Sequence, residues 1–155
     1  MYQKVVVPLD GSELAECVLP HVETITKGCG VQDVMFVRVV EPFYAPSGED
    51  SYAFNDEDVR RINSENKTVA EKYLGKVVEQ AGYDGVNVQS EVLSGRAAES
   101  IADYATTNKV DLIVIATHGR SGISRWVWGS VADRVLRSSC IPVVMVRAPG
   151  CVPGI

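Results

Sequence analysis

The sequence predicts an α/β fold: one domain built on a doubly wound, five-stranded parallel sheet with helices on both faces. Five runs rich in apolar and β-branched residues alternate with helical segments, in the order βαβαβαβαβ. Strands that alternate with helices pair in parallel through right-handed crossovers. The run Asp111–Ala116 is apolar almost without interruption, which is typical of a strand covered on both faces. A chain of 155 residues is long enough for one such core.

The first strand and the first helix follow directly from the N-terminus. A β-branched strand at 4–9 leads into a helix with Asp10 or Ser12 as its N-cap, and Lys27-Gly28 is its C-terminal signal. Pro20 falls inside this helix, so we expect a kink or one unmade hydrogen bond. Spacings of three and four predict that one face carries Leu14, Val18, Val22 and Ile25.

A second strand at 33–40 is followed by a loop at 43–55, which has no period and is expected to be mobile. A long amphipathic helix at 56–81, closed by Gly82, has the apolar positions Val59, Ile62, Val69, Tyr73, Val77 and Ala81. The strand at 86–93 alternates visibly, which suits a sheet edge. The helix 96–107 is expected to turn inward Ala98, Ile101, Ala102 and Ala105.

The C-terminal part contains the strand 111–116, a glycine-containing loop, a helix at 130–137 and a last strand at 142–147. We expect the helix to bury Val131, Val135 and Leu136. The folded domain is predicted to span 1–147. The tail 148–155, which contains Pro149-Gly150 and Pro153-Gly154, is expected to be loosely ordered.

Composition and charge narrow the classes of function. The net charge is −5 and no basic block occurs, which disfavours a nucleic-acid surface. No apolar run approaches the 18 residues of a membrane span, and no signal peptide precedes the first strand, so we expect a cytoplasmic protein. The cysteines lack CxxC spacing and are interpreted as small apolar residues or free thiols: Cys17, Cys29, Cys140 and Cys151.

A phosphate site is predicted where the helix 130–137 begins. In doubly wound sheets ligands bind outside the carboxyl ends of the strands, where the strand order reverses. The N–H groups of Gly129, Ser130 and Val131 lie at a helix start, which favours an anion. Gly119 would allow close backbone approach to the phosphates, and Arg120 would neutralise their charge. The Ser130 hydroxyl could bond a phosphate or contact its Mg²⁺.

The other strand ends supply the rest of a nucleotide site. Asp10 suits a ribose hydroxyl pair, although it could be only a helix cap. Pro8, Val39 and Ile115 would line an apolar slot for adenine. Several residues also have plainer interpretations: loop glycines for Gly119, Gly122 and Gly129, a packed loop histidine for His118, and packing of the loop or a partner chain for Trp126 and Trp128.

Other classes of phosphate- and nucleotide-handling protein are disfavoured because the sequence lacks the residues that they require. The P-loop pattern GxxxxGK[ST] is absent, and so is a His-x-Gly-His nucleotidyl-transferase loop. A phosphate-accepting receiver domain needs paired acids after its first strand, whereas Asp10 stands alone there. No paired carboxylates or triad residues converge on the strand ends, which makes a dedicated enzyme the weaker class.

The chain resembles the universal stress protein family, in its ATP-binding branch, over about 4–147. The resemblance rests on the opening Val5–Ser12, on Val39–Pro42, and on Ala116-Thr117-His118-Gly119 followed after nine residues by Gly129-Ser130. The family pattern has Gly where Ala116 stands, so we expect weakened rather than abolished binding. The resemblance implies nucleotide contacts at Pro8, Leu9, Asp10, Val39, Ile115, Ala116, His118, Gly119, Arg120, Gly122, Gly129, Ser130 and Val131.

The resemblance also implies the strand order 3-2-1-4-5, which leaves the strand 142–147 at an edge. This strand is apolar, and an open apolar edge is a template for pairing with another chain. We therefore expect a homodimer, unless the tail 148–155 folds back over the edge. The implied function is a small regulatory module that binds ATP, ADP, AMP or a cyclic nucleotide, with Mg²⁺ on the phosphates, and is sensed by an unknown protein partner. A slow ATPase and an interaction protein that has lost its nucleotide are the alternatives.

Overall fold

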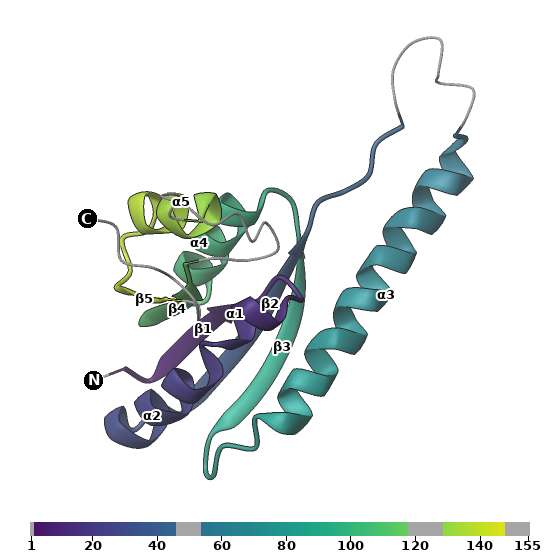
Figure 1. Cartoon of the computed structure of the whole chain (residues 1–155). Coiled ribbons are helices and arrows are strands. Elements are labelled where there is room, and N and C mark those ends of the chain that lie inside the picture. Colours follow the sequence, from purple (N-terminus) through teal and green to yellow (C-terminus); the bar gives the residue numbers. More distant parts are fainter. Residues whose placement is uncertain (1, 46–53, 118–128, 148–155) are drawn as a thin grey trace.

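The computed structural model describes residues 2–45, 54–117 and 129–147. Five strands form one parallel sheet in the order β3-β2-β1-β4-β5, which confirms the predicted fold class and strand order (Figure 1). The strands are β1 (Lys4–Pro8), β2 (Asp33–Val40), β3 (Asn87–Ser94), β4 (Leu112–Ala116) and β5 (Val143–Val146). The alternating strand β3 lies at one edge, as its pattern predicted, and β5 lies at the other.

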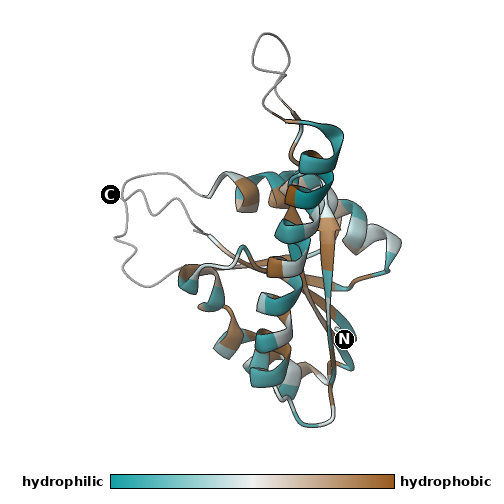
Figure 2. Ribbon diagram, turned by 90° about the vertical axis from the view of Figure 1, so that its right-hand side faces the viewer, coloured by the Kyte–Doolittle hydropathy of each residue, from teal (hydrophilic) through white to brown (hydrophobic). Residues whose placement is uncertain are grey.

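Helices cover both faces of this sheet. One face packs against α1 (Glu13–Glu16), α2 (Leu19–Cys29) and α3 (Asp56–Gln80), and the other against α4 (Ala97–Thr107) and α5 (Ser130–Ser138) (Figure 1). Side chains of β1 alternate between the two cores: Val5 and Val7 face α1–α3, and Val6 faces α4 and α5. The hydropathy colouring shows many hydrophobic residues on the strands and many hydrophilic residues on the helices around them (Figure 2).

The first predicted helix is two helices, because Pro20 breaks the segment rather than kinking it. α1 ends at Glu16, and α2 starts at Leu19 with Pro20 in its first turn. A proline there loses nothing, since the first N–H groups of a helix have no intrahelical acceptor. The predicted end at Lys27-Gly28 is also wrong: α2 continues to Cys29, and Gly30 forms the left-handed cap with φ +67°.

Two predicted apolar helix faces are partly wrong. In α3, Val69 is 58% exposed, and the buried residues are Ala70, Leu74 and Val77. In α5, Val131 and Leu136 are exposed, whereas Ala132 and Val135 are buried. In both helices an alanine faces the sheet, and the larger apolar side chain beside it faces outward. The inward residues predicted for α4 are confirmed: Ala98, Ile101, Ala102 and Ala105.

The connection between β2 and α3 is fixed at its base. The rings of Phe43 and Phe54 lie edge to face with their centroids 5.2 Å apart. The Phe43 N–H donates to Asn63 Oδ1 (2.7 Å), and Asn63 Nδ2 donates to the Phe43 carbonyl (3.1 Å). Both ends of the predicted loop 43–55 are therefore held against the start of α3. Residues 46–53 of that loop lie outside the described residues, and so does the tail 148–155.

The described ranges contain no helix that is long and apolar enough to cross a membrane. They also contain no group of three or more His, Cys, Asp or Glu side chains that could hold a metal ion. Cys17 and Cys29 are half-buried free thiols, and Cys140 is an exposed one. Cys151 lies outside the described residues.

Candidate functional site

Three apolar side chains predicted to line an adenine slot share one face of the sheet. Val39 and Ile115 both pack into the core between the sheet and α4 and α5. Pro8 is buried and lies two residues beyond Val6, so the alternation of the strand places it on the same face. The carboxyl ends of β1, β2 and β4 thus present these three positions on the α4/α5 side.

Leu9 and Ala116, also predicted to contact the nucleotide, belong to the opposite core. Their exposed fractions are 3% and 8%, and both pack in the cluster that faces α1–α3. The Leu9 N–H donates to the Val37 carbonyl (2.8 Å). Any contact of these two residues with a ligand at the strand ends would therefore be made through backbone atoms.

Asp10 is fixed by the helix start that follows it. Ser12 is the N-cap of α1, because its side chain accepts the Ala15 N–H (3.2 Å). Asp10 Oδ1 accepts both the Ser12 N–H (2.9 Å) and the Ser12 hydroxyl (2.6 Å). Asp10 is therefore not the cap but the residue that orients it. A carboxylate has about four lone-pair sites, so it can accept further donors.

A cavity of about 320 Å³ lies at the carboxyl edge of the sheet, where α4 and α5 begin. Ser130 and Val131 line it, together with Glu41 from the end of β2. The remaining lining residues come from the starts of α4 and α5: Arg96, Ala97, Ala98, Glu99 and Arg134. Arg134 Nη1 lies 3.5 Å from Glu99 Oε1, so one arginine is already paired with a carboxylate. The cavity is open to solvent, and its lining is mixed: two arginines and two carboxylates lie beside apolar alanine and valine side chains.

The start of α5 corrects one predicted role. The Gly129 N–H donates to the Thr117 carbonyl (2.7 Å), so it is not directed at a ligand. The next N–H groups, from Ser130 onward, belong to the first turn of a nine-residue helix and have no intrahelical acceptor. Anion binding at this helix would therefore begin at Ser130 and not at Gly129.

The loop between β4 and α5 lies outside the described residues from 118 to 128. The predicted site residues His118, Gly119, Arg120 and Gly122 fall in this range, and so do Trp126 and Trp128. Their roles stay predictions.

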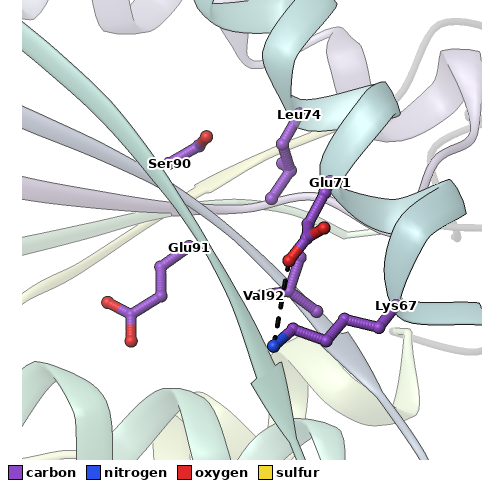
Figure 3. A pocket seen from close by; sticks show the side chains of 6 residues that line it. All are labelled: Lys67, Glu71, Leu74, Ser90, Glu91 and Val92. Atoms are coloured by element: carbon purple, nitrogen blue, oxygen red, sulfur yellow. Dashed lines mark ion pairs between the residues drawn. The ribbon is translucent and has the colours of Figure 1, made fainter. Parts of the chain in front are cut away.

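A second hollow, of about 300 Å³, lies between α3 and the edge strand β3 (Figure 3). Lys67 and Glu71 on α3 form an ion pair of 3.8 Å beside Leu74 and Val92, and Glu91 extends to the opposite side of β3 (Figure 3). This groove holds none of the predicted site residues. Its charges are solvent-exposed, and such pairs contribute little.

Three arginines that lie near these strand ends were not predicted as site residues. Arg96 and Arg134 line the cavity, and Arg38 contacts the turn that carries Asp10. Arg38 did carry a signal, because it is the one charged residue inside the run Val34–Val40. Arg96 and Arg134 carried none, since arginine is ordinary at an exposed helix position.

A doubly wound parallel sheet with the strand order 3-2-1-4-5 and a cavity beyond its strand ends defines a Rossmann-like α/β fold. Folds of this class bind their ligands at that edge of the sheet. The model of the Universal stress protein family matches residues 1–147, and the chain belongs to this family. Universal stress protein MJ0531 of Methanocaldococcus jannaschii is 33% identical over 150 residues, which cover 96% of this chain and 84% of that protein.

Solved structures share the fold. The universal stress protein UspA from Lactobacillus plantarum superposes with a TM-score of 0.78 at 20% identity, covering 94% of this chain and 98% of that one. A universal stress protein in complex with cAMP gives 0.61 at 20% identity, with 95% and 98% covered. A family protein from Arabidopsis thaliana with AMP bound gives 0.59 at 16% identity, with 96% and 93% covered.

Proposed function

We propose that the chain binds ATP, or ADP or AMP, as a regulatory module whose bound state is recognised by a protein partner. The observation that carries the proposal is the cavity at the carboxyl edge, into which the start of α5 faces with Ser130 and Val131. Family structures that hold AMP and cAMP support an adenine nucleotide as the ligand class.

The base and the ribose are assigned to the strand ends. Pro8, Val39 and Ile115 would form the apolar slot for adenine, since all three lie on the α4/α5 face. Asp10 would accept the ribose hydroxyl pair, because an ionised carboxylate only accepts hydrogen bonds. Leu9 and Ala116 would contribute backbone contacts. Ala116 stands where the family has glycine. Its side chain packs in the core that faces α1–α3, away from the adenine slot, so its methyl group should weaken binding only slightly.

The phosphates are assigned to the start of α5. The N–H groups of Ser130 and Val131 would hold phosphate oxygens, and the Ser130 hydroxyl would bond a phosphate or its Mg²⁺. His118, Gly119, Arg120 and Gly122 are proposed to complete this side from the preceding loop. Gly129 would serve by leaving room at the helix start, since its own N–H is bonded to Thr117.

Two measurements test nucleotide binding. The purified protein is denatured and any released nucleotide is identified by mass. Calorimetry then compares ATP binding by the parent with that by Gly129→Asp, which places a side chain and a negative charge beside the phosphates, and we expect no measurable binding by this variant. Gly28→Asp makes the same change on exposed α2 and should bind like the parent. Equal binding by Gly129→Asp would refute the assignment.

A slow ATPase is the second candidate. The sequence shows no pair of carboxylates at the strand ends that could act as general acid and base. Among the described residues, two carboxylates line the cavity, Glu41 and Glu99, and Glu99 is already paired with Arg134. We therefore expect steady-state turnover far below the ~1–100 s⁻¹ of kinases. A rate within that range would favour the enzyme. If the denatured protein releases no nucleotide and added ATP does not bind, the protein is an interaction module that has lost the ligand.

We further propose a homodimer through β5, which lies at the open edge of the sheet. The carbonyls of Pro142 and Val146 accept the N–H groups of Ile113 and Thr117, so the backbone groups of Met145 point to the open edge. Val144 on this edge is 37% exposed. Two copies that pair about a two-fold axis would satisfy these groups.

Light scattering at micromolar concentration tests the dimer. Met145→Pro removes an edge N–H and should give a monomer, whereas Met145→Ala keeps the N–H and should stay dimeric. A monomeric parent contradicts the proposal, and so does a folded proline variant that remains fully dimeric.

A further inference from the structure

Arg38 is the one charged residue in the run Val34–Val40 of β2, and it lies on a face of the strand that packs against the core. The alternation of β2 places it on the same face as Val34 and Phe36, which pack against α1–α3. Its side chain is half-buried at the carboxyl end of the strand. A charge in such a place is tolerated only when neighbouring groups compensate it.

The guanidinium of Arg38 lies flat against the backbone of Gly11. A Cβ atom built on Gly11 would lie 3.0 Å from Nη1, 3.1 Å from Cζ and 3.3 Å from Nη2. These nearly equal distances mean that the plane of the group faces the glycine. Gly11 has φ +86°, so two features favour glycine here: the left-handed backbone and the lack of space for a side chain.

A second contact holds the guanidinium from α3. Arg38 Cζ lies 5.3 Å from the centroid of the Tyr73 ring, within the range of a cation–π interaction. The Tyr73 hydroxyl donates to Glu16 Oε1 (2.9 Å), and Glu16 lies on α1. Ser12 caps α1 and is bonded to Asp10. The contacts of Arg38, Tyr73 and Glu16 therefore form a closed ring that starts and ends at the Asp10-Gly11 turn.

The charges in this ring of contacts act on one another. Burial raises the pKa of Tyr73 well above its usual value, and the hydrogen bond to Glu16 and the negative charges of Glu16 and Asp10 raise it further. The positive charge of Arg38 opposes this shift. The charges of Asp10, Glu16 and Arg38 thus all lie close enough to the Tyr73 hydroxyl to act on its pKa.

We propose that Arg38, supported by Tyr73 and Glu16, is a positioning residue that holds the Asp10-Gly11 turn in the geometry that binds the ribose hydroxyl pair. This inference rests on the proposed function. Arg38 is not expected to touch the nucleotide, because it lies on the α1–α3 side of the sheet whereas the adenine slot lies on the α4/α5 side. Its effect on binding should therefore be confined to the contact that Asp10 makes.

The test compares ATP with 2′,3′-dideoxy-ATP, which lacks both ribose hydroxyls, by calorimetry. The Kd for dideoxy-ATP divided by the Kd for ATP reports the contact of Asp10 with the ribose hydroxyls. The Asp10→Asn variant sets the lower limit of this ratio. In the parent we expect dideoxy-ATP to bind about tenfold or more weakly, because hydrogen bonds to a charged group are strong. Arg38→Met should lower this ratio at least ~threefold while the Kd for dideoxy-ATP stays within about twofold. Arg60→Met, an exposed arginine on α3, should leave both values unchanged.

Two milder variants keep the test decisive if Arg38→Met fails to fold. Tyr73→Phe removes only the bond to Glu16 and should lower the ratio less than Arg38→Met. Arg38→Lys keeps the charge but loses the flat contact, and should fall between the parent and Arg38→Met.

Each outcome points to one conclusion. A ratio that falls in the Arg38 and Tyr73 variants supports the positioning role. If the parent discriminates but these variants weaken both nucleotides equally, Arg38 is merely structural, and the inference is wrong while the proposed function stands. A parent that binds no nucleotide, or does not discriminate, contradicts the assignment of Asp10 itself and overturns the inference with it.

Discussion

Substitution of Gly11 by alanine should destabilise the protein more than the same change at Gly30. Both glycines have positive φ, +86° and +67°, so alanine at either site costs about 1–2 kcal/mol of backbone strain. A Cβ on Gly30 would meet nothing within 4 Å, whereas on Gly11 it would meet three guanidinium atoms of Arg38 at 3.0–3.3 Å. The guanidinium would have to leave its position over Tyr73, which adds roughly 0.5–1 kcal/mol.

Urea unfolding measures this difference directly, provided that the transition is two-state. Gly11→Ala should lower the free energy of unfolding by about 2 kcal/mol and Gly30→Ala by about 1 kcal/mol. Gly28→Ala, inside α2 with open space around it, should be neutral or stabilising by up to ~1 kcal/mol. In an Arg38→Ala background the excess cost at Gly11 should disappear. Equal costs at Gly11 and Gly30 in the parent would refute the role assigned to the guanidinium.

Two further predictions concern stability. Leu74→Ala should lower the free energy of unfolding by about 2–5 kcal/mol, because Leu74 is buried in the core under α3. Val69→Ala on the same helix should change it by less than ~0.5 kcal/mol, because Val69 is exposed. Equal effects of the two substitutions in urea titrations would mean that the helix presents a different face to the sheet. The Asp111 carboxylate accepts the N–H groups of Lys4 and Gln3, in that order of effect, which lowers its pKa below the usual 3.8. Its stabilising contribution is therefore present above that value and is lost as the pH falls through the lower pKa of the folded state. The difference in melting temperature between the parent and Asp111→Asn should shrink on acidification, and a difference that is constant with pH would contradict this.

The strands could be predicted from the sequence because their signals are local. The predicted limits of the second strand, 33–40, are those of β2, since the apolar run begins at Val34 and is stopped by Glu41-Pro42. The strand order agrees with the one that the family resemblance implied.

The helix faces could be predicted only in part, because large apolar residues were taken to be the buried ones. Ala70 and Ala132 are buried instead of their neighbours Val69 and Val131. Where a helix lies close to a sheet, a small side chain fits the contact, and side-chain size then misleads a pattern based on hydrophobicity.

The candidate site was predictable where it depends on strand ends and not where it depends on long-range contacts. Pro8, Val39 and Ile115 follow from alternation and topology, and the structure places them on one face. The contact of Arg38 with Gly11 and Tyr73 joins three segments that are far apart in the sequence. No local pattern indicates which of many arginines meets which turn, so this part required the structure.

Because of the contacts among Phe43, Phe54 and Asn63, the length of the segment between the two rings should have little effect on the stability of the sheet. The ring pair joins the two ends of this segment, and two hydrogen bonds between the Phe43 backbone and the Asn63 side chain tie its first end to α3. Each doubling of a closed loop costs only about 0.6 kcal/mol in chain entropy. The ten residues 44–53 could therefore be replaced by a longer insert, such as an epitope or a reporter peptide, without disturbing the strand ends where the nucleotide is proposed to bind.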